Sequence, residues 1–464
     1  MTKGQPSLSQ QVWSATVWNT LLFPARFLVG IVASVIYYQT LSLEQVGLLF
    51  LLTTMASTIG LWADLGVERA LPRFIPEIEQ SEGKRGVRRF MNRMIRLKLG
   101  ILAALILALN LLGGPLTGYM SESQRETVAD RQTQLAALPA DAGHAKARAD
   151  LAAQLAADEA LVSQIEQDGR LFLGVVSALL VLGALFDVYM QFLTAYFKQR
   201  AWNLITLATT LLQPILVTIF LLLGWGVNGV LLGMVLTPLA SVALAAWQAR
   251  RASGELEDKP GSGAPPEDLP RRFARFAGVS YLMQVSTWLY DIQFVLVFAA
   301  ALLNSTEIAL LGFAYKFAKD YLGYVWTPLG GVMTPLLTRI KARRDPAALR
   351  EAHASLTRMI WLIVVPAGVG LALLTPRMLQ ALYPKYQETA ALIIIFIAFT
   401  FAESLLSVPH NVLMVYEHYK AVIWSRVAAL LVIPLVYLLL PRFGLVGVAL
   451  AVGLVRVGSR LITV

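Results

Sequence analysis

Residues 13–38 read WSATVWNTLLFPARFLVGIVASVIYY, and this segment decides the fold class. It exceeds the roughly 20 apolar residues that an α-helix needs to cross a bilayer. One cation, Arg26, interrupts it. A cation near the middle of a membrane helix costs about 2.5–3.5 kcal/mol on insertion scales. We therefore expect Arg26 to have an anionic partner, either in the protein or in a ligand.

Apolar runs of this kind recur along the whole chain of 464 residues. Hydrophobic residues make up 57% and charged residues 15% of it, and the mean hydropathy is +0.62, which excludes an ordinary soluble domain. Backbone groups in lipid must be hydrogen-bonded internally, so the runs are expected to be helices. The sequence predicts an all-α polytopic membrane protein with about twelve spans. They lie near residues 13–38, 44–63, 92–113, 171–193, 203–223, 227–247, 276–302, 307–337, 358–375, 389–413, 421–440 and 443–464.

The net charge of +10 is concentrated in alternate loops. Basic residues cluster at 84–96, 198–200, 250–275 and 341–344, whereas the opposite loops carry few of them outside one long insert. The positive-inside rule places the basic loops and both termini in the cytoplasm. We expect a multi-pass protein of the cytoplasmic membrane that attracts anionic lipids and has no nucleic-acid partner.

A polar segment at residues 250–275, rich in glycine and proline, divides the chain. It predicts a cytoplasmic linker between an N-terminal six-helix lobe, residues 1–249, and a C-terminal six-helix lobe, residues 276–464. Equal halves in the same orientation suggest a parallel repeat.

A second polar segment, residues 121–169, interrupts the N-terminal lobe. Its apolar residues keep helical spacing, and a Pro- and Gly-containing turn divides it, so we expect a helical hairpin on the outer side. A solvated appendage and a lid over substrate are both compatible with this pattern.

Signatures of soluble catalysis are missing from the sequence. It has no cysteine, its four histidines have no metal-ligand spacing, and it has no phosphate-binding loop of the ATPase type. We therefore expect no enzyme activity, no metal and no cofactor. Energy for any work would come from a gradient, the membrane potential or a partner.

Polar side chains inside the apolar runs are the functional candidates, because they cannot face lipid. They line either the interior of the bundle or a hydrated cavity. The candidates are Asn19, Arg26, Asp187, Gln191, Asp291, Lys316, Lys319, Asp320 and Glu403.

Two interpretations of these charges compete. In the first, they pair with one another, for instance Lys316 with Asp320 or Arg26 with Asp291, and form a structural or gating network. In the second, Arg26, Lys316 and Lys319 form a cationic site for an anion. Arginine offers a planar fork for phosphate oxygens and lysine a mobile point charge. We expect Asn19, Asp187, Gln191, Asp291, Asp320 and Glu403 to line the cavity or act in gating.

Three stretches and one further residue carry a resemblance to a known family. The stretches are Leu41–Gly47 (LSLEQVG), Ala63–Ile75 (ADLGVERALPRFI) and Glu307–Lys316 (EIALLGFAYK), and the residue is Asp291. The chain resembles the polysaccharide transporter family, which includes the O-antigen flippases and belongs to the superfamily of multidrug, oligosaccharidyl-lipid and polysaccharide exporters. The resemblance extends over most of the chain. The hairpin at 121–169 departs from the usual short loop.

The resemblance implies two six-helix lobes around a central cavity, which alternates between inward and outward openings. It also implies movement of an undecaprenyl-pyrophosphate-linked oligosaccharide to the outer leaflet, with membrane lipids and glycan-assembly proteins as partners. Arg26, Lys316 and Lys319 are the positions matched to the family's cationic cavity.

Two alternatives stay open at this point. A cation-coupled drug exporter of the same superfamily would need an acidic cavity in one lobe. A membrane polysaccharide polymerase or ligase would place catalytic groups in a large outer loop, and the segment 121–169 lacks a clear acid/base cluster.

Overall fold

The computed structural model describes residues 28–111, 125, 128–139, 145–196, 198–254, 268–299, 302–343, 346–416 and 418–462. Every regular element within these ranges is an α-helix or a short 3-10 helix, which confirms the predicted all-α class. The described part of the first apolar run is a helix, Leu28–Thr40. Asn19 and Arg26 lie outside the described residues.

Membrane-length helices dominate the described part of the chain. Eight of them are long and apolar enough to cross a bilayer. A ninth span results if α8 (Leu269–Leu289) and α9 (Ile292–Ala299), which meet at a 65° bend, are taken as one broken span. The multi-spanning character predicted from the apolar runs is thus confirmed. One expected span, α10 (Ser305–Arg343), is not among the eight.

The chain divides into two compact units. Unit 1 comprises residues 1–41, 55–117 and 167–284, and unit 2 comprises residues 42–54, 118–166 and 285–464. Within the predicted linker, α7 (Gly226–Gly254) extends to residue 254 and α8 begins at residue 269. The division into six-helix lobes at 249 and 276 stays a prediction.

Unit 1 is built around a long helix, α3 (Val67–Leu111), whose apolar side chains form its core with α7, α8 and the second half of α5 (Ala145–Ala195). At the centre, the ring of Phe74 lies 5.4 Å from that of Phe273 and 6.1 Å from that of Phe276. The helix α6 (Gln199–Leu222) packs along α7 as an antiparallel hairpin.

A tight turn in unit 1 joins α2 (Leu43–Asp64) to α3. Gly66 has a φ of +70°, in the left-handed region that favours glycine. A Cβ atom at this position would also overlap the backbone carbonyl of Ala277 in α8. The turn therefore requires glycine for two reasons, and it places Asp64 and Glu68 on either side of it.

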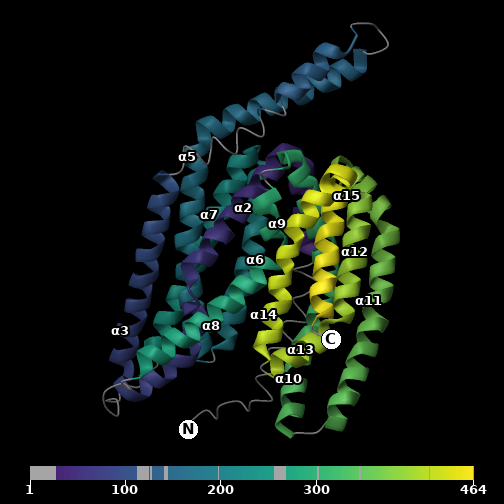
Figure 1. Ribbon diagram of the computed structural model, residues 1–464. Helices are drawn as coiled ribbons and strands as arrows, with labels where there is room; N and C mark the ends of the chain where they lie inside the picture. The colour runs from purple at the N-terminus through teal and green to yellow at the C-terminus, as the bar shows by residue number, and fades with distance from the viewer. Residues whose placement is uncertain are drawn as a thin grey trace. The chain divides into compact units, whose positions relative to one another are not determined.

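Unit 2 is organised around α12 (Ala390–Leu405), which contacts α10, α11 (Pro346–Leu382) and α15 (Val432–Leu461). Figure 1 shows these helices in green to yellow. The buried ring of Phe313 in α10 packs 4.2 Å from that of Tyr386 in η1 (Pro384–Thr389). The shorter elements α13 (Ser407–Val415), α14 (Tyr419–Val427) and η2 (Ala428–Leu431) complete the unit.

Two helices of unit 2 begin with reciprocal caps. At α2, the amide of Gln45 donates to Ser42 Oγ and the amide of Ser42 donates to Gln45 Oε1. At α10, Asn304 and Glu307 form the same arrangement. Such capping boxes satisfy amides that have no partner inside the helix, so both helix starts are encoded locally.

The insert at 121–169 forms the predicted helical hairpin in its described part. A helix over residues 128–137 lies against the start of α5. The amide of Gln132 donates to Glu159 at 3.0 Å, and the guanidinium of Arg148 donates to the carbonyl of Leu138 at 2.7 Å.

Candidate functional site

The face of α10 carries three charged side chains, Lys316, Lys319 and Asp320, all of them exposed. Lys316 pairs with Asp320 one turn away at 3.6 Å, as the structural interpretation expected. Charged groups of a membrane bundle face its interior or a hydrated space rather than lipid. This face of α10 therefore belongs at a hydrated surface.

Lys319 connects this face to the bend between α8 and α9. Its Nζ lies 3.3 Å from Oδ2 of Asp291, the residue immediately before α9. It also lies 5.3 Å from the ring centroid of Tyr315, within cation–π range. Asp291 thus pairs with Lys319 in unit 2, whereas its expected pairing with Arg26 involves a residue outside the described part.

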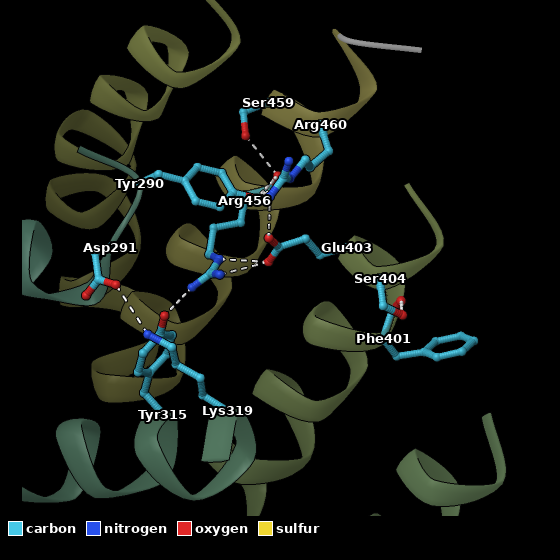
Figure 2. A network of polar contacts seen from close by, with 10 residues as sticks. All are labelled: Tyr290, Asp291, Tyr315, Lys319, Phe401, Glu403, Ser404, Arg456, Ser459 and Arg460. Carbon is cyan, nitrogen blue, oxygen red and sulfur yellow. Dashed lines mark hydrogen bonds and ion pairs between the residues drawn. The ribbon is translucent and has the colours of Figure 1, made fainter. Parts of the chain in front are cut away.

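Glu403 near the end of α12 is shared by two arginines of α15 (Figure 2). Arg456 Nη2 lies 2.9 Å and its Nε 3.0 Å from Oε2 of the carboxylate. Arg460 Nη2 lies 3.2 Å from Oε1. The three side chains are only 14–20% exposed, so solvent screens these contacts weakly.

Two tyrosines extend these contacts: Tyr315 lies between Arg456 and Lys319, and Tyr290 lies between the two arginines. Tyr315 accepts a hydrogen bond from Arg456 Nη1. Tyr290 donates to the backbone carbonyl of Arg456 at 3.0 Å and accepts from Nε of Arg460 at 3.2 Å. Dashed lines in Figure 2 join Asp291 to Lys319, and join Tyr315 through Arg456 to Glu403. The cation–π contact between Lys319 and Tyr315 connects these two parts. We call this set, with Tyr290 and Arg460, the unit 2 network.

The unit 2 network carries an excess of positive charge. Three cations, Lys319, Arg456 and Arg460, face two carboxylates, Asp291 and Glu403, which leaves one formal positive charge. The arginines are mostly buried, whereas the Lys319 side chain is 52% exposed. The arrangement can attract a polyanion from the lysine side while the arginines raise the local positive potential.

A second charged cluster lies in unit 1. Lys98 of α3 pairs with Asp64 at 3.4 Å and donates a hydrogen bond to Glu68. Asp187 of α5 interacts electrostatically with all three. Gln191 lies one turn further along α5 and is half-buried. The described parts contain no group of three or more His, Cys, Asp or Glu side chains arranged to hold a metal ion.

Sequence reasoning overlooked six of these residues. Lys98, Arg456 and Arg460 lie in apolar runs and are found by the argument applied to Arg26, that a charge in a membrane helix has a partner. The other three, Asp64, Glu68 and Tyr290, stand at helix ends, where polar residues are ordinary. Their sequence contains no signal that marks them as members of a cluster.

Comparisons with known proteins agree with this architecture. A family model described as polysaccharide biosynthesis protein matches residues 161–391. A structure described as the lipid II flippase MurJ in an inward closed conformation has a TM-score of 0.61 at 14% identity, covering 96% of this chain and 86% of that one. The predicted resemblance to the polysaccharide transporter family and its exporter superfamily is confirmed by the family model and the shared fold.

Two further superfamily structures share the fold. A mutant of the Vibrio cholerae MATE transporter VcmN has a TM-score of 0.57 at 14% identity, covering 98% of this chain and 95% of that one. An inward-facing multidrug resistance MATE transporter has a TM-score of 0.58 at 13% identity, covering 94% and 92%. No curated protein matches the sequence significantly. At these identities the structural likeness establishes the fold and leaves the substrate to the chemistry of the site.

Proposed function

We propose that the protein is a flippase that moves an undecaprenyl-pyrophosphate-linked oligosaccharide from the inner to the outer leaflet of the cytoplasmic membrane by alternating access. The observation that carries this proposal is the sharing of Glu403 by Arg456 and Arg460 beside Lys319, which leaves an excess positive charge. The family model described as polysaccharide biosynthesis protein and the fold shared with a lipid II flippase support the same substrate class.

The proposed roles follow from exposure and charge. Lys319 and Lys316 are exposed and meet the pyrophosphate directly, each as a mobile point charge. Arg456 and Arg460 stay engaged with Glu403 and hold the site at positive potential. Arg26, outside the described residues, is proposed as a further ligand for the pyrophosphate. Asp291 and Asp320 are proposed as the counter-charges of the lysines that return when the anion leaves, and Glu403 as the permanent counter-charge of the arginines.

The proposal also covers the orientation of the chain in the membrane and its partners. Both termini lie in the cytoplasm because the basic loops lie there. Membrane lipids surround the spans, and glycan-assembly proteins supply and consume the lipid-linked substrate.

Translocation by the purified protein tests this function. Proteoliposomes are loaded with an undecaprenyl-pyrophosphate oligosaccharide, and its exposure on each face is followed with a glycan-oxidising reagent that does not cross the bilayer. We expect wild-type protein to expose glycan from the inner leaflet. Arg456→Gln should slow this exposure at least tenfold, because it removes a charged group whose hydrogen bonds contribute about 1.5–3 kcal/mol each. Arg442→Gln, an exposed arginine of α15 outside the network, serves as the matched control.

The same vesicles separate the competing classes. A new covalent glycan product would show that the protein is a polymerase or ligase. Vesicles whose glycan stays on its original face, with folded protein present, would contradict the flippase assignment.

A cation-coupled drug exporter is the second candidate, and one observation favours it. Three carboxylates, Asp64, Glu68 and Asp187, surround a single lysine in unit 1, which is the acidic character such an exporter needs. Efflux of lipophilic cations from the same vesicles, without movement of the lipid-linked glycan, would establish this alternative.

A further inference from the structure

Arg426 of α14 carries a charge inside an apolar stretch of unit 2. It lies within the candidate membrane span Lys420–Leu461, where a cation faces the protein interior or a hydrated space rather than lipid. Its Nη1 donates a hydrogen bond to the hydroxyl of Thr287 in α8 at 2.6 Å and lies 3.5 Å from that of Ser286. The two hydroxyls orient the guanidinium group, and they do not neutralise its charge.

His410 of α13 lies within electrostatic range of Arg426 and of Arg460 in α15. Its side chain is only 6% exposed, and no described residue forms a hydrogen bond with its Nδ1. Buried polar atoms in proteins nearly always have a partner, so an unsatisfied one points to a molecule that completes its hydrogen bonding. A ring nitrogen that the described protein leaves unused thus lies close to two guanidinium groups.

The chemistry of these side chains restricts what they can bind. A guanidinium group has only donors, in a planar fork that fits a carboxylate or a phosphate. The hydroxyl of Thr287 can donate or accept, and so can a neutral imidazole through its two nitrogens. Thr287 is exposed, which makes its pair with Arg426 accessible. A sugar that carries a carboxylate supplies an anion together with hydroxyl groups, whereas a pyrophosphate linkage supplies acceptors alone.

These residues adjoin the unit 2 network through one shared member. Arg460 pairs with Glu403 at 3.2 Å and is also the second cation near His410. Lys319, which is proposed to meet the pyrophosphate, instead contacts Asp291 and the ring of Tyr315. A substrate with two separate anionic groups would therefore engage two different parts of unit 2.

We propose that Thr287, His410 and Arg426, together with Arg460, form a binding site for an acidic sugar, so that the oligosaccharide moved by the protein carries a carboxylate of the uronic-acid type. The guanidinium groups bind the carboxylate, and Thr287 and His410 bind neighbouring sugar hydroxyls. The specificity rests on the proposed function, because the sugar reaches the site as part of the lipid-linked substrate.

A matched pair of lipid-linked disaccharides tests the site. Both carry undecaprenyl pyrophosphate, and one ends in glucose where the other ends in glucuronic acid. Binding to the full-length protein in nanodiscs and translocation in proteoliposomes are measured for each lipid. We expect wild-type protein to bind the acidic lipid about tenfold more tightly or better, because the added carboxylate forms charged hydrogen bonds with arginine.

Three variants locate the source of this preference. Arg426→Gln should reduce it to about twofold or less, because an amide replaces the guanidinium fork. Thr287→Val is the milder change, which removes only the hydroxyl that orients Arg426, and it should lower the preference in the same direction. Lys420→Gln removes an exposed cation of the same helix and is the matched control, which should keep the full preference.

Two results would overturn the proposal. Equal binding of the two lipids by wild-type protein would exclude an acidic-sugar site, and this measurement needs no variant to fold. Variants of Arg426 and Thr287 that weaken both lipids by the same factor would assign the arginine to the pyrophosphate or to packing. Preferred binding of the acidic lipid by a protein that moves neither lipid would instead refute the proposed flippase function and leave the sugar site standing.

Discussion

Glu403 holds together two arginines that would otherwise repel each other. Its two oxygens contact Arg456 at 2.9 Å and Arg460 at 3.2 Å, and all three side chains are largely buried. Removing one partner of a buried charge group leaves the others uncompensated, which makes such a carboxylate far more important for stability than an exposed one. The two arginines that Glu403 neutralises are thus also the source of the positive charge proposed to attract an anion.

The variant Glu403→Gln should therefore lose stability and gain sensitivity to anions. We expect a free energy of unfolding lower by about 3–5 kcal/mol, because Arg456 and Arg460 then lack a counter-charge. Inorganic pyrophosphate should restore part of the loss by replacing the carboxylate. Thermal unfolding in detergent with and without pyrophosphate measures both effects. The exposed Glu388→Gln is the control, and a Glu403 variant that pyrophosphate leaves unchanged would contradict the account.

How far these pairs could be predicted depended on their separation in sequence. Lys316 and Asp320 lie at i, i+4 on one helix, so their pairing followed from helical geometry. Glu403 and Arg456 lie 53 residues apart, and Lys98 and Glu68 lie 30 apart. Their pairing depends on how α12 packs on α15 and how α3 bends at Gly83, which no local pattern encodes.

At the scale of elements, the turn between α2 and α3 fixes the geometry of the unit 1 cluster. Gly66 adopts a φ of +70° and lies against the carbonyl of Ala277 in α8. The sequence predicted both helices from their apolar runs. It did not predict the close approach of α8, because the glycine requirement comes from a residue more than 200 positions away.

Two glycine substitutions should have opposite effects on stability. Gly66→Ala should destabilise the protein by more than the roughly 1–2 kcal/mol of a left-handed backbone, since its Cβ also overlaps α8. Gly100→Ala, in α3 with no atom within 4 Å of the added Cβ, should stabilise it by about 0.5–1 kcal/mol. Unfolding temperatures of the two variants measure the difference. Equal shifts of the same sign would show that the turn does not contact α8 as described.

At the scale of the whole molecule, composition was enough to predict an all-α, multi-spanning chain. The helical elements of the described residues and the fold shared with a solved flippase confirm it. Charge alternation among the loops supplied the orientation, which stays a prediction. What composition could not supply was the separation of charge between the units. Unit 2 holds a network with excess positive charge, and unit 1 holds a buried cluster with excess negative charge.

Binding of a short prenyl pyrophosphate tests the central claim most directly. Calorimetry with farnesyl pyrophosphate and farnesyl monophosphate compares wild-type protein with Lys319→Gln and with the control Arg442→Gln. The account predicts that wild-type protein and the control prefer the pyrophosphate, and that Lys319→Gln weakens its binding about tenfold or more, corresponding to a charged hydrogen bond of roughly 1.5–3 kcal/mol. Equal affinity of all three proteins for the two ligands would contradict a pyrophosphate site in the unit 2 network.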